Sequence, residues 1–215
     1  MITLCGFAVS NYFNVVKQVL LEKQITYAEE RVMTRSKDEA VLSASPLGKI
    51  PFIRTAQGSL CETPVILDYL EAQFPAHPLL PADAFAAAKV RELCTFINLH
   101  LELVARDLYP AVFFGGSISD EHKENTRKQL VRNIEAFKRL VKFAPYVAGD
   151  SFTLADCVAF NNLPLIGMAS KAAYGEDLLL SAGMDYKPYI KLVGERASSQ
   201  QVAAERKAEM ARPRN

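Results

Sequence analysis

Three prolines within seven positions, Pro75, Pro78 and Pro81, divide this chain into two parts with different hydrophobic patterns. Because proline lacks a backbone donor and disfavours helix in the residue before it, such a cluster is typical of a connection between folded regions. Short apolar runs alternate with helical periodicity before the cluster, whereas only helical periodicity follows it. We therefore expect two domains, at residues 1–75 and 86–215, joined by a linker at residues 76–85.

The first part alternates candidate strands and helices. Apolar and alternating runs predict strands at residues 2–5, 26–33, 51–54 and 59–61, and helical periodicity predicts helices at 12–23, 36–43 and 63–74. The resulting order, β-α-β-α-β-β-α, suits a small mixed sheet with helices on its faces. This is the α/β arrangement of the thioredoxin-like fold.

The second part is predicted to be an all-α helical bundle. Apolar residues recur at spacings of three and four along a long first segment, at Val90, Cys94, Ile97, Leu101, Val104 and Leu108. A later helix has its own start signal, because Thr153 and Asp156 are spaced as in a capping box and precede an apolar run.

Composition excludes several classes of protein. Half of the 215 residues are hydrophobic, and 25 basic against 24 acidic residues give a formal net charge of +1. A large core can form, but a nucleic-acid surface or a basic membrane contact is not expected. No apolar run approaches the roughly 20 residues that span a bilayer, and the first residues do not have the pattern of a signal peptide.

The four cysteines form no Cys-x-x-Cys pair and have no histidine at metal-ligand spacing. They are Cys5, Cys61, Cys94 and Cys157. We expect reduced thiols, no metal site and a cytoplasmic protein.

Two segments between residues 45 and 71 carry the clearest functional signal. Lys49-Ile50-Pro51 places a proline at the start of a predicted strand, and Glu62-Thr63 places an acid and a hydroxyl at the start of a predicted helix. The first amides of a helix lack partners, so this position favours anions. The combination can hold a small peptide by its backbone, its amine and its carboxylate.

These segments resemble the glutathione-binding half of the soluble glutathione transferase family. The resemblance covers nearly the whole chain and includes a third segment, the helix start from Gly149 to Asp156. Each segment is weak evidence alone, but their order and spacing together are specific. The match is to bacterial, serine-type (theta-like) members, which implies glutathione as a cosubstrate, a detoxification role and a homodimer.

The resemblance also implies which residues bind glutathione. In the family, the proline that matches Pro51 follows a cis bond, and the backbone of the residue matching Ile50 pairs with the cysteinyl unit. The γ-glutamyl carboxylate is expected on Thr63 and its ammonium near Glu62, with Lys37 and Lys49 near the glycine carboxylate. The simpler alternatives are that Thr63 only caps its helix and that the lysines are solvated.

The catalytic group must stabilise the glutathione thiolate, because the thiol is a poor nucleophile. Ser10 matches the catalytic serine of serine-type members, although it can also be an N-cap only, and Asn11 is the second candidate. Gly6 stands where tyrosine-type members have a phenol, and Tyr12 stands where cysteine-type members have a thiol. The chain departs from the usual serine pattern at Asn11 and at Asn14, where many members have a basic residue.

A hydrophobic electrophile is expected beside Tyr12, Tyr109, Phe113 and Phe114, although the last three can instead be core residues. Two other functions stay open. One is a member that binds glutathione or a protein without catalysis, and the other is a glutathione-dependent thiol-disulfide oxidoreductase or peroxidase that uses a cysteine such as Cys5.

Overall fold

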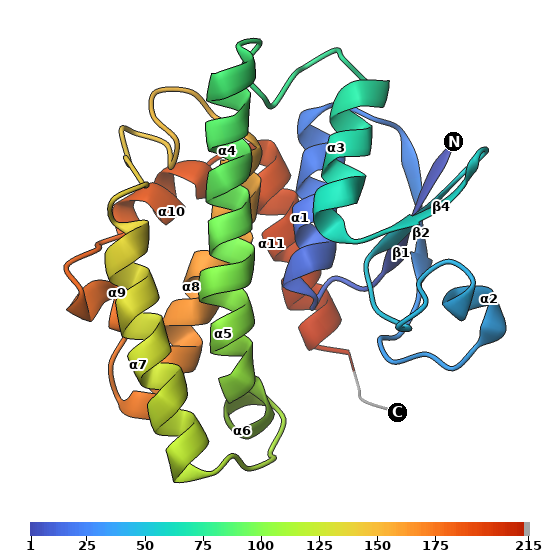
Figure 1. Cartoon of the computed structure of the whole chain (residues 1–215). Helices are drawn as coiled ribbons and strands as arrows, with labels where there is room; N and C mark the ends of the chain where they lie inside the picture. Colours follow the sequence, from blue (N-terminus) through green and yellow to red (C-terminus); the bar gives the residue numbers. More distant parts are fainter. Residues whose placement is uncertain (213–215) are drawn as a thin grey trace. The chain divides into compact units, whose positions relative to one another are not determined.

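Contacts within the computed structural model, which describes residues 1–212, divide the chain into two units (Figure 1). The first unit comprises Met1–Leu80 together with the chain from Gly194 onward, and the second comprises Pro81–Val193. The first unit has the mixed sheet of a thioredoxin-like fold, and the second unit is helical. This confirms the expected fold class.

A four-stranded sheet in the order β2-β1-β3-β4 forms the centre of the first unit. The strands are β1 (Ile2–Gly6), β2 (Tyr27–Arg31), β3 (Phe52–Thr55) and β4 (Gly58–Cys61). β1 pairs with β2 in parallel and with β3 antiparallel, and β3 pairs antiparallel with β4. Cys5 lies opposite Phe52, which lies opposite Cys61, so the end of β1, the start of β3 and the end of β4 share one edge.

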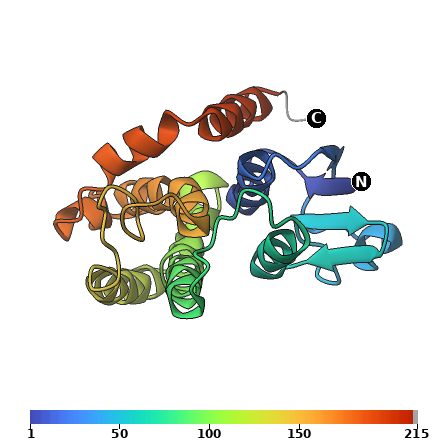
Figure 2. The same ribbon diagram turned by 90° about the horizontal axis from the view of Figure 1, so that it is seen from above.

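Helices cover both faces of this sheet. α1 (Asn11–Glu22) and α3 (Thr63–Gln73) lie side by side on one face, and α2 (Glu39–Leu42) lies on the other (Figures 1 and 2). The α2 side has its own apolar cluster, in which Cys5 and Phe52 pack with Val41 and Ala44. Because successive strand residues alternate between faces, the fully buried Leu4 and Ile53 face α1 and α3.

The last helix, α11 (Ala197–Met210), belongs to the first unit because ion pairs attach it to α1. The Lys17 side chain is 1% exposed and pairs with Glu29 of β2 at 2.6 Å and with Glu205 of α11. Arg196, at the start of α11, pairs with Glu22 of α1 at 2.6 Å. The helix α11, which was expected in the second domain, is therefore part of the first unit.

This grouping differs from the expected helical domain at residues 86–215. Helical periodicity identifies a helix but does not show which unit it packs against, so the sequence could not assign α11 to the sheet unit. Residues 213–215 of the expected range lie outside the described residues.

The second unit consists of helices and turns. They are α4 (Ala84–Phe96), a π-helical stretch (Ile97–Glu102), α5 (Leu103–Ala105), a 3₁₀ turn (Arg106–Leu108), α6 (Tyr109–Phe113), α7 (Asp120–Phe137), α8 (Leu154–Tyr174), α9 (Leu178–Ser181) and α10 (Lys187–Gly194). The predicted long helix is therefore present but changes its winding after Phe96. Within residues 1–212, every helix is too short or too polar to cross a bilayer.

The predicted capping box begins α8. The Thr153 side chain caps the helix, and Asp156 accepts a hydrogen bond from the Thr153 amide at 2.8 Å. The fully buried Asp156 carboxylate also accepts from the Val147 amide and the Tyr189 hydroxyl, both at 2.9 Å. One carboxylate therefore joins the loop before α8, the helix itself and α10.

We predict that Asp156→Ala lowers the free energy of unfolding by about 3–5 kcal/mol, because it leaves several buried donors without an acceptor. Urea denaturation followed by circular dichroism measures the loss. The control is Asp150→Ala, which removes an exposed carboxylate close by in the chain and should change the midpoint little. Equal midpoints for the two variants would contradict the structural role of Asp156.

Candidate functional site

A glycine at the end of β1 lets three segments meet at one edge of the sheet. A Cβ added to Gly6 would lie 2.6 Å from the Phe13 ring and 3.3 Å from the Ile50 side chain. Gly6 also has a φ of +148°, which side chains rarely allow. The start of α1 and the loop before β3 can therefore approach β1 closely only because no side chain stands between them.

Ser10 and Asn11 lie where α1 begins at this edge. Ser10 is the N-cap, and its hydroxyl oxygen accepts from the Phe13 amide at 3.3 Å. Asn11 is 5% exposed, whereas Ser10 and Tyr12 are half-buried. No acidic residue lies in the first turn of α1, so the positive end of the helix dipole is not neutralised there.

The peptide bond between Ile50 and Pro51 is cis, which agrees with the expectation from the family. Ile50 is half-buried, and its backbone N–H and C=O have no hydrogen-bond partner within residues 1–212. A half-buried backbone with unpaired groups is available to an extended peptide that adds itself as a strand.

Lys37 and Lys49 lie on two loops that are tied together. The Arg35 amide donates to the Gly48 carbonyl at 2.6 Å, and a Cβ on Gly48 would lie 2.4 Å from the Ser36 carbonyl oxygen. Both lysines are exposed, and neither forms a salt bridge in the part of the chain that the structure describes. Their ammonium groups can therefore turn toward an anion without breaking an existing pair.

Glu62, and not Thr63, is the N-cap of α3, which corrects the simple interpretation of Thr63 as the cap. Glu62 has a φ of +69° and makes no side-chain capping bond, while its carbonyl accepts from the Ile66 amide at 3.0 Å. The left-handed backbone of Glu62 turns the chain sharply after β4, and α3 begins at Thr63, the first residue of the predicted range. Strained backbone at a non-glycine residue is often found at binding sites.

Thr63 becomes the first residue of α3 and keeps its polar groups available. Its side chain is 5% exposed, and within residues 1–212 its hydroxyl and its amide have no hydrogen-bond partner. The Glu62 carboxylate is exposed beside it. A hydroxyl, an amide and a carboxylate at one helix start can recognise an amino-acid group that carries both an anion and an ammonium.

The aromatic residues of the predicted electrophile site lie in the second unit and differ from one another. Tyr109 is 5% exposed, and its hydroxyl donates to the buried Glu102 carboxylate at 3.2 Å. The Phe113 ring lies 5.1 Å from the Tyr109 ring, whereas Phe114 is 73% exposed. Tyr109 therefore belongs to the core of this unit, and Phe114 offers far more surface to a ligand.

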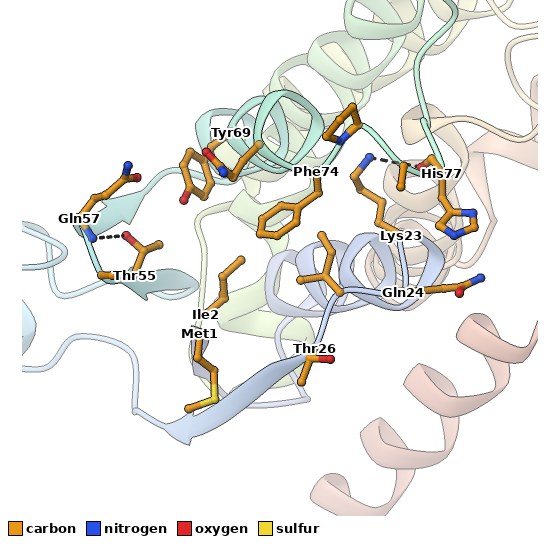
Figure 3. Close-up of a pocket in the computed structure, with 15 residues that line it drawn as sticks. Met1, Ile2, Lys23, Gln24, Thr26, Thr55, Gln57, Tyr69, Phe74 and His77 are labelled. Atoms are coloured by element: carbon orange, nitrogen blue, oxygen red, sulfur yellow. Dashed lines mark hydrogen bonds between the residues drawn. The ribbon is translucent and has the colours of Figure 1, made fainter.

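A pocket of about 770 Å³ lies in the first unit away from these residues, at the start of β1 and the ends of α1 and α3. The Phe74 ring turns toward it, and Lys23 lies at its side (Figure 3). The Lys23 ammonium is already bound by Glu71 at 2.7 Å and by the His77 carbonyl at 3.2 Å. None of the predicted site residues lines this pocket, so its size is not evidence for the glutathione site.

Comparison with known proteins supports one family. A family model described as the N-terminal domain of glutathione S-transferase matches residues 4–78. A glutathione S-transferase from Pseudomonas putida is 40% identical over 210 residues, which cover 98% of this chain and 94% of the relative. A stringent starvation protein A homolog from Pasteurella multocida is 28% identical and covers 88% of this chain and 84% of that protein.

Solved structures show the same fold. A structure of glutathione S-transferase III in apo form matches with a TM-score of 0.77 at 24% identity and covers 100% of this chain and 99% of that one. Poplar glutathione transferase F1 matches with a TM-score of 0.78 at 18% identity, over 96% and 98% of the two chains. Because the identity to the Pseudomonas relative extends over almost the whole length of both proteins, this chain belongs to the glutathione S-transferase family.

Proposed function

We propose that this protein is a glutathione transferase, which binds glutathione at the edge formed by Ser10, Ile50, Pro51, Glu62 and Thr63. It activates the sulfur as a thiolate for attack on an apolar electrophile. The observation that carries this proposal is that three segments with polar groups available to a ligand meet at one edge. They are the Ile50 backbone, the start of α3 and the start of α1.

Each part of glutathione has a counterpart at this edge. The Ile50 amide and carbonyl pair with the cysteinyl backbone, as in the addition of a strand to a sheet. Thr63 donates from its hydroxyl and amide to the γ-glutamyl carboxylate, and Glu62 pairs with the ammonium. Lys37 and Lys49 attract the glycine carboxylate as mobile point charges.

Thiolate formation is assigned to the start of α1. A thiol with a pKa near 8.5 needs roughly 2.7 kcal/mol of preferential thiolate stabilisation for its pKa to fall by about two units. Because the Ser10 oxygen already accepts from the Phe13 amide, the hydroxyl proton is left to donate to the sulfur. Asn11 is the second candidate donor. The thiolate then forms a carbon–sulfur bond as the leaving group departs from the electrophile.

Among the residues expected to contact the apolar electrophile, Phe114 is the most accessible, whereas Tyr109 is a core residue of its unit. A homodimer and a cytoplasmic location are further proposals that rest on the family. Conjugation, reduction of a peroxide, isomerisation and dehalogenation all begin from the same thiolate, and the proposal names conjugation.

A redox mechanism through Cys5 is disfavoured. Cys5 is fully buried in β1, and burial together with the neighbouring Glu30 carboxylate raises the pKa of its thiol to about 12. Such a group carries almost no thiolate at neutral pH, so it is a poor nucleophile.

A member of the same fold without transferase activity is the second candidate, because several relatives are named as stringent starvation protein A homologs and not as transferases. It would keep the Glu62 and Thr63 features and lose thiolate formation. The ultraviolet absorbance of bound glutathione near neutral pH separates the two, since only the thiolate absorbs strongly.

We predict that Glu62→Ala combined with Thr63→Ala weakens glutathione binding at least about tenfold, because charge-assisted hydrogen bonds contribute about 1.5–3 kcal/mol each. Retention on immobilised glutathione and calorimetry measure the loss. Glu39→Ala, which removes an exposed acid in α2, is the matched control. Equal retention of the parent and the double variant would remove the proposed site.

We predict that Ser10→Ala lowers kcat on a model aryl halide about a hundredfold, because one preorganised donor to the developing charge is lost. Glutathione affinity should change little, since the Ile50 and Thr63 contacts stay. Steady-state kinetics and the thiolate absorbance of the complex test this. Unchanged turnover would transfer the catalytic role to Asn11, which Asn11→Ala then tests.

We predict that Cys61 is the first thiol to react with an aromatic disulfide reagent at about pH 8, because it is half-buried while Cys5, Cys94 and Cys157 are buried. The fast phase should correspond to one thiol per chain and vanish in Cys61→Ser. All four thiols should react once the protein is denatured. A fast phase that persists in Cys61→Ser and vanishes in Cys5→Ser would revive the redox mechanism.

A further inference from the structure

Asn14 is a fully buried amide one helical turn after Ser10. Its side-chain nitrogen donates to the Ala8 carbonyl at 2.8 Å, and both groups are buried. Its side-chain oxygen is buried and has no hydrogen-bond partner in the described part of the chain. Only one of the two polar ends of this amide is therefore satisfied.

This arrangement is unfavourable for stability. Asn14 is 0% exposed, so water does not reach the unpaired oxygen. A buried acceptor without a partner keeps its full desolvation cost, and a leucine of similar size would have none. Packing does not explain an asparagine here, whereas its bond to Ala8 does.

That bond fixes the short loop that carries Ser10. Ala8 lies between the end of β1 and the start of α1, and the Ser10 amide donates to the Phe7 carbonyl at 3.1 Å in the same loop. The Asn14 amide donates to the Ser10 carbonyl at 3.1 Å, as expected in a helix. One residue therefore holds this loop at two points, through its side chain at Ala8 and through its backbone at Ser10.

We propose that Asn14 is a positioning residue for thiolate formation, which holds the Ala8 carbonyl so that the Ser10 hydroxyl stays directed at the sulfur. This inference rests on the proposed function. A donor must lie within hydrogen-bond distance of the developing charge, and a displacement of about 1 Å can reduce a rate by about a hundredfold. The contacts proposed for glutathione at Ile50, Glu62 and Thr63 lie outside this loop.

The test is Asn14→Leu, which keeps the size of the side chain and removes both the donor and the unpaired oxygen. We expect kcat on chlorodinitrobenzene to fall at least about tenfold, while the KM for glutathione stays within about twofold. The apparent pKa in the pH profile of kcat/KM should rise by about one unit, because the thiolate is less stabilised. The melting temperature should change by only a few degrees, because the removal of the unpaired oxygen offsets the acceptor left at Ala8.

Gln18→Leu is the matched control. Gln18 lies one turn further along α1, is fully buried, and donates to the Ser199 hydroxyl of α11 at 2.9 Å. Its replacement also removes a buried amide from α1, at a position one turn further from Ser10. The control should therefore leave the pH profile unchanged even where it lowers stability.

Each outcome decides a different point. If Ser10→Ala loses activity but Asn14→Leu keeps its kcat and pH profile, the inference fails and the proposed function stands. If Gln18→Leu shifts the profile as much as Asn14→Leu, the effect is a general loosening of α1 and the inference also fails. If the parent protein has no glutathione-dependent turnover, the inference and the proposed function fail together. Should Asn14→Leu not fold, Asn14→Ala, which cannot clash, is measured in its place with the same expected shifts.

Discussion

The arrangement of the site depends on the close approach of three chain segments at Gly6. The Phe13 ring and the Ile50 side chain occupy the space that a side chain at this position would need. The same contact brings the start of α1 and the unpaired backbone of Ile50 to the end of β1. A larger residue at position 6 would push the Ser10 hydroxyl away from the Ile50 backbone. In the proposed function, the groups that bind glutathione and the group that activates its sulfur would then be too far apart to act on the same molecule.

The two helix starts at this edge complement each other electrostatically. Neither α1 nor α3 has an acidic residue in its first turn, so both leave a positive field at the site. One field suits a thiolate and the other suits a carboxylate. Glu62 lies just before α3, where it can pair with an ammonium without neutralising the turn behind it. These charges fit the ligand of the proposed function, which carries an ammonium and a carboxylate at one end and a thiol that must lose its proton.

The order of strands and helices in the first unit and the capping box at Thr153 were predictable because periodicity and capping are local properties of the sequence. Three other features depend on side-chain contacts or on backbone angles that local patterns do not indicate. The left-handed turn at Glu62 has no glycine to indicate it. The bond from Asn14 to Ala8 was missed because a polar residue in a helix usually indicates a solvated face. The return of α11 to the first unit depends on Lys17, whose partners lie on β2 and on α11.

The place of α11 has a consequence for how the protein is made. The ribosome delivers the sheet and its first helices early, then the whole second unit, and only afterwards the helix that neutralises Lys17. Until then, the Lys17 ammonium has Glu29 but not Glu205 as a partner. The first unit therefore acquires its last helix only after the whole second unit has been synthesised.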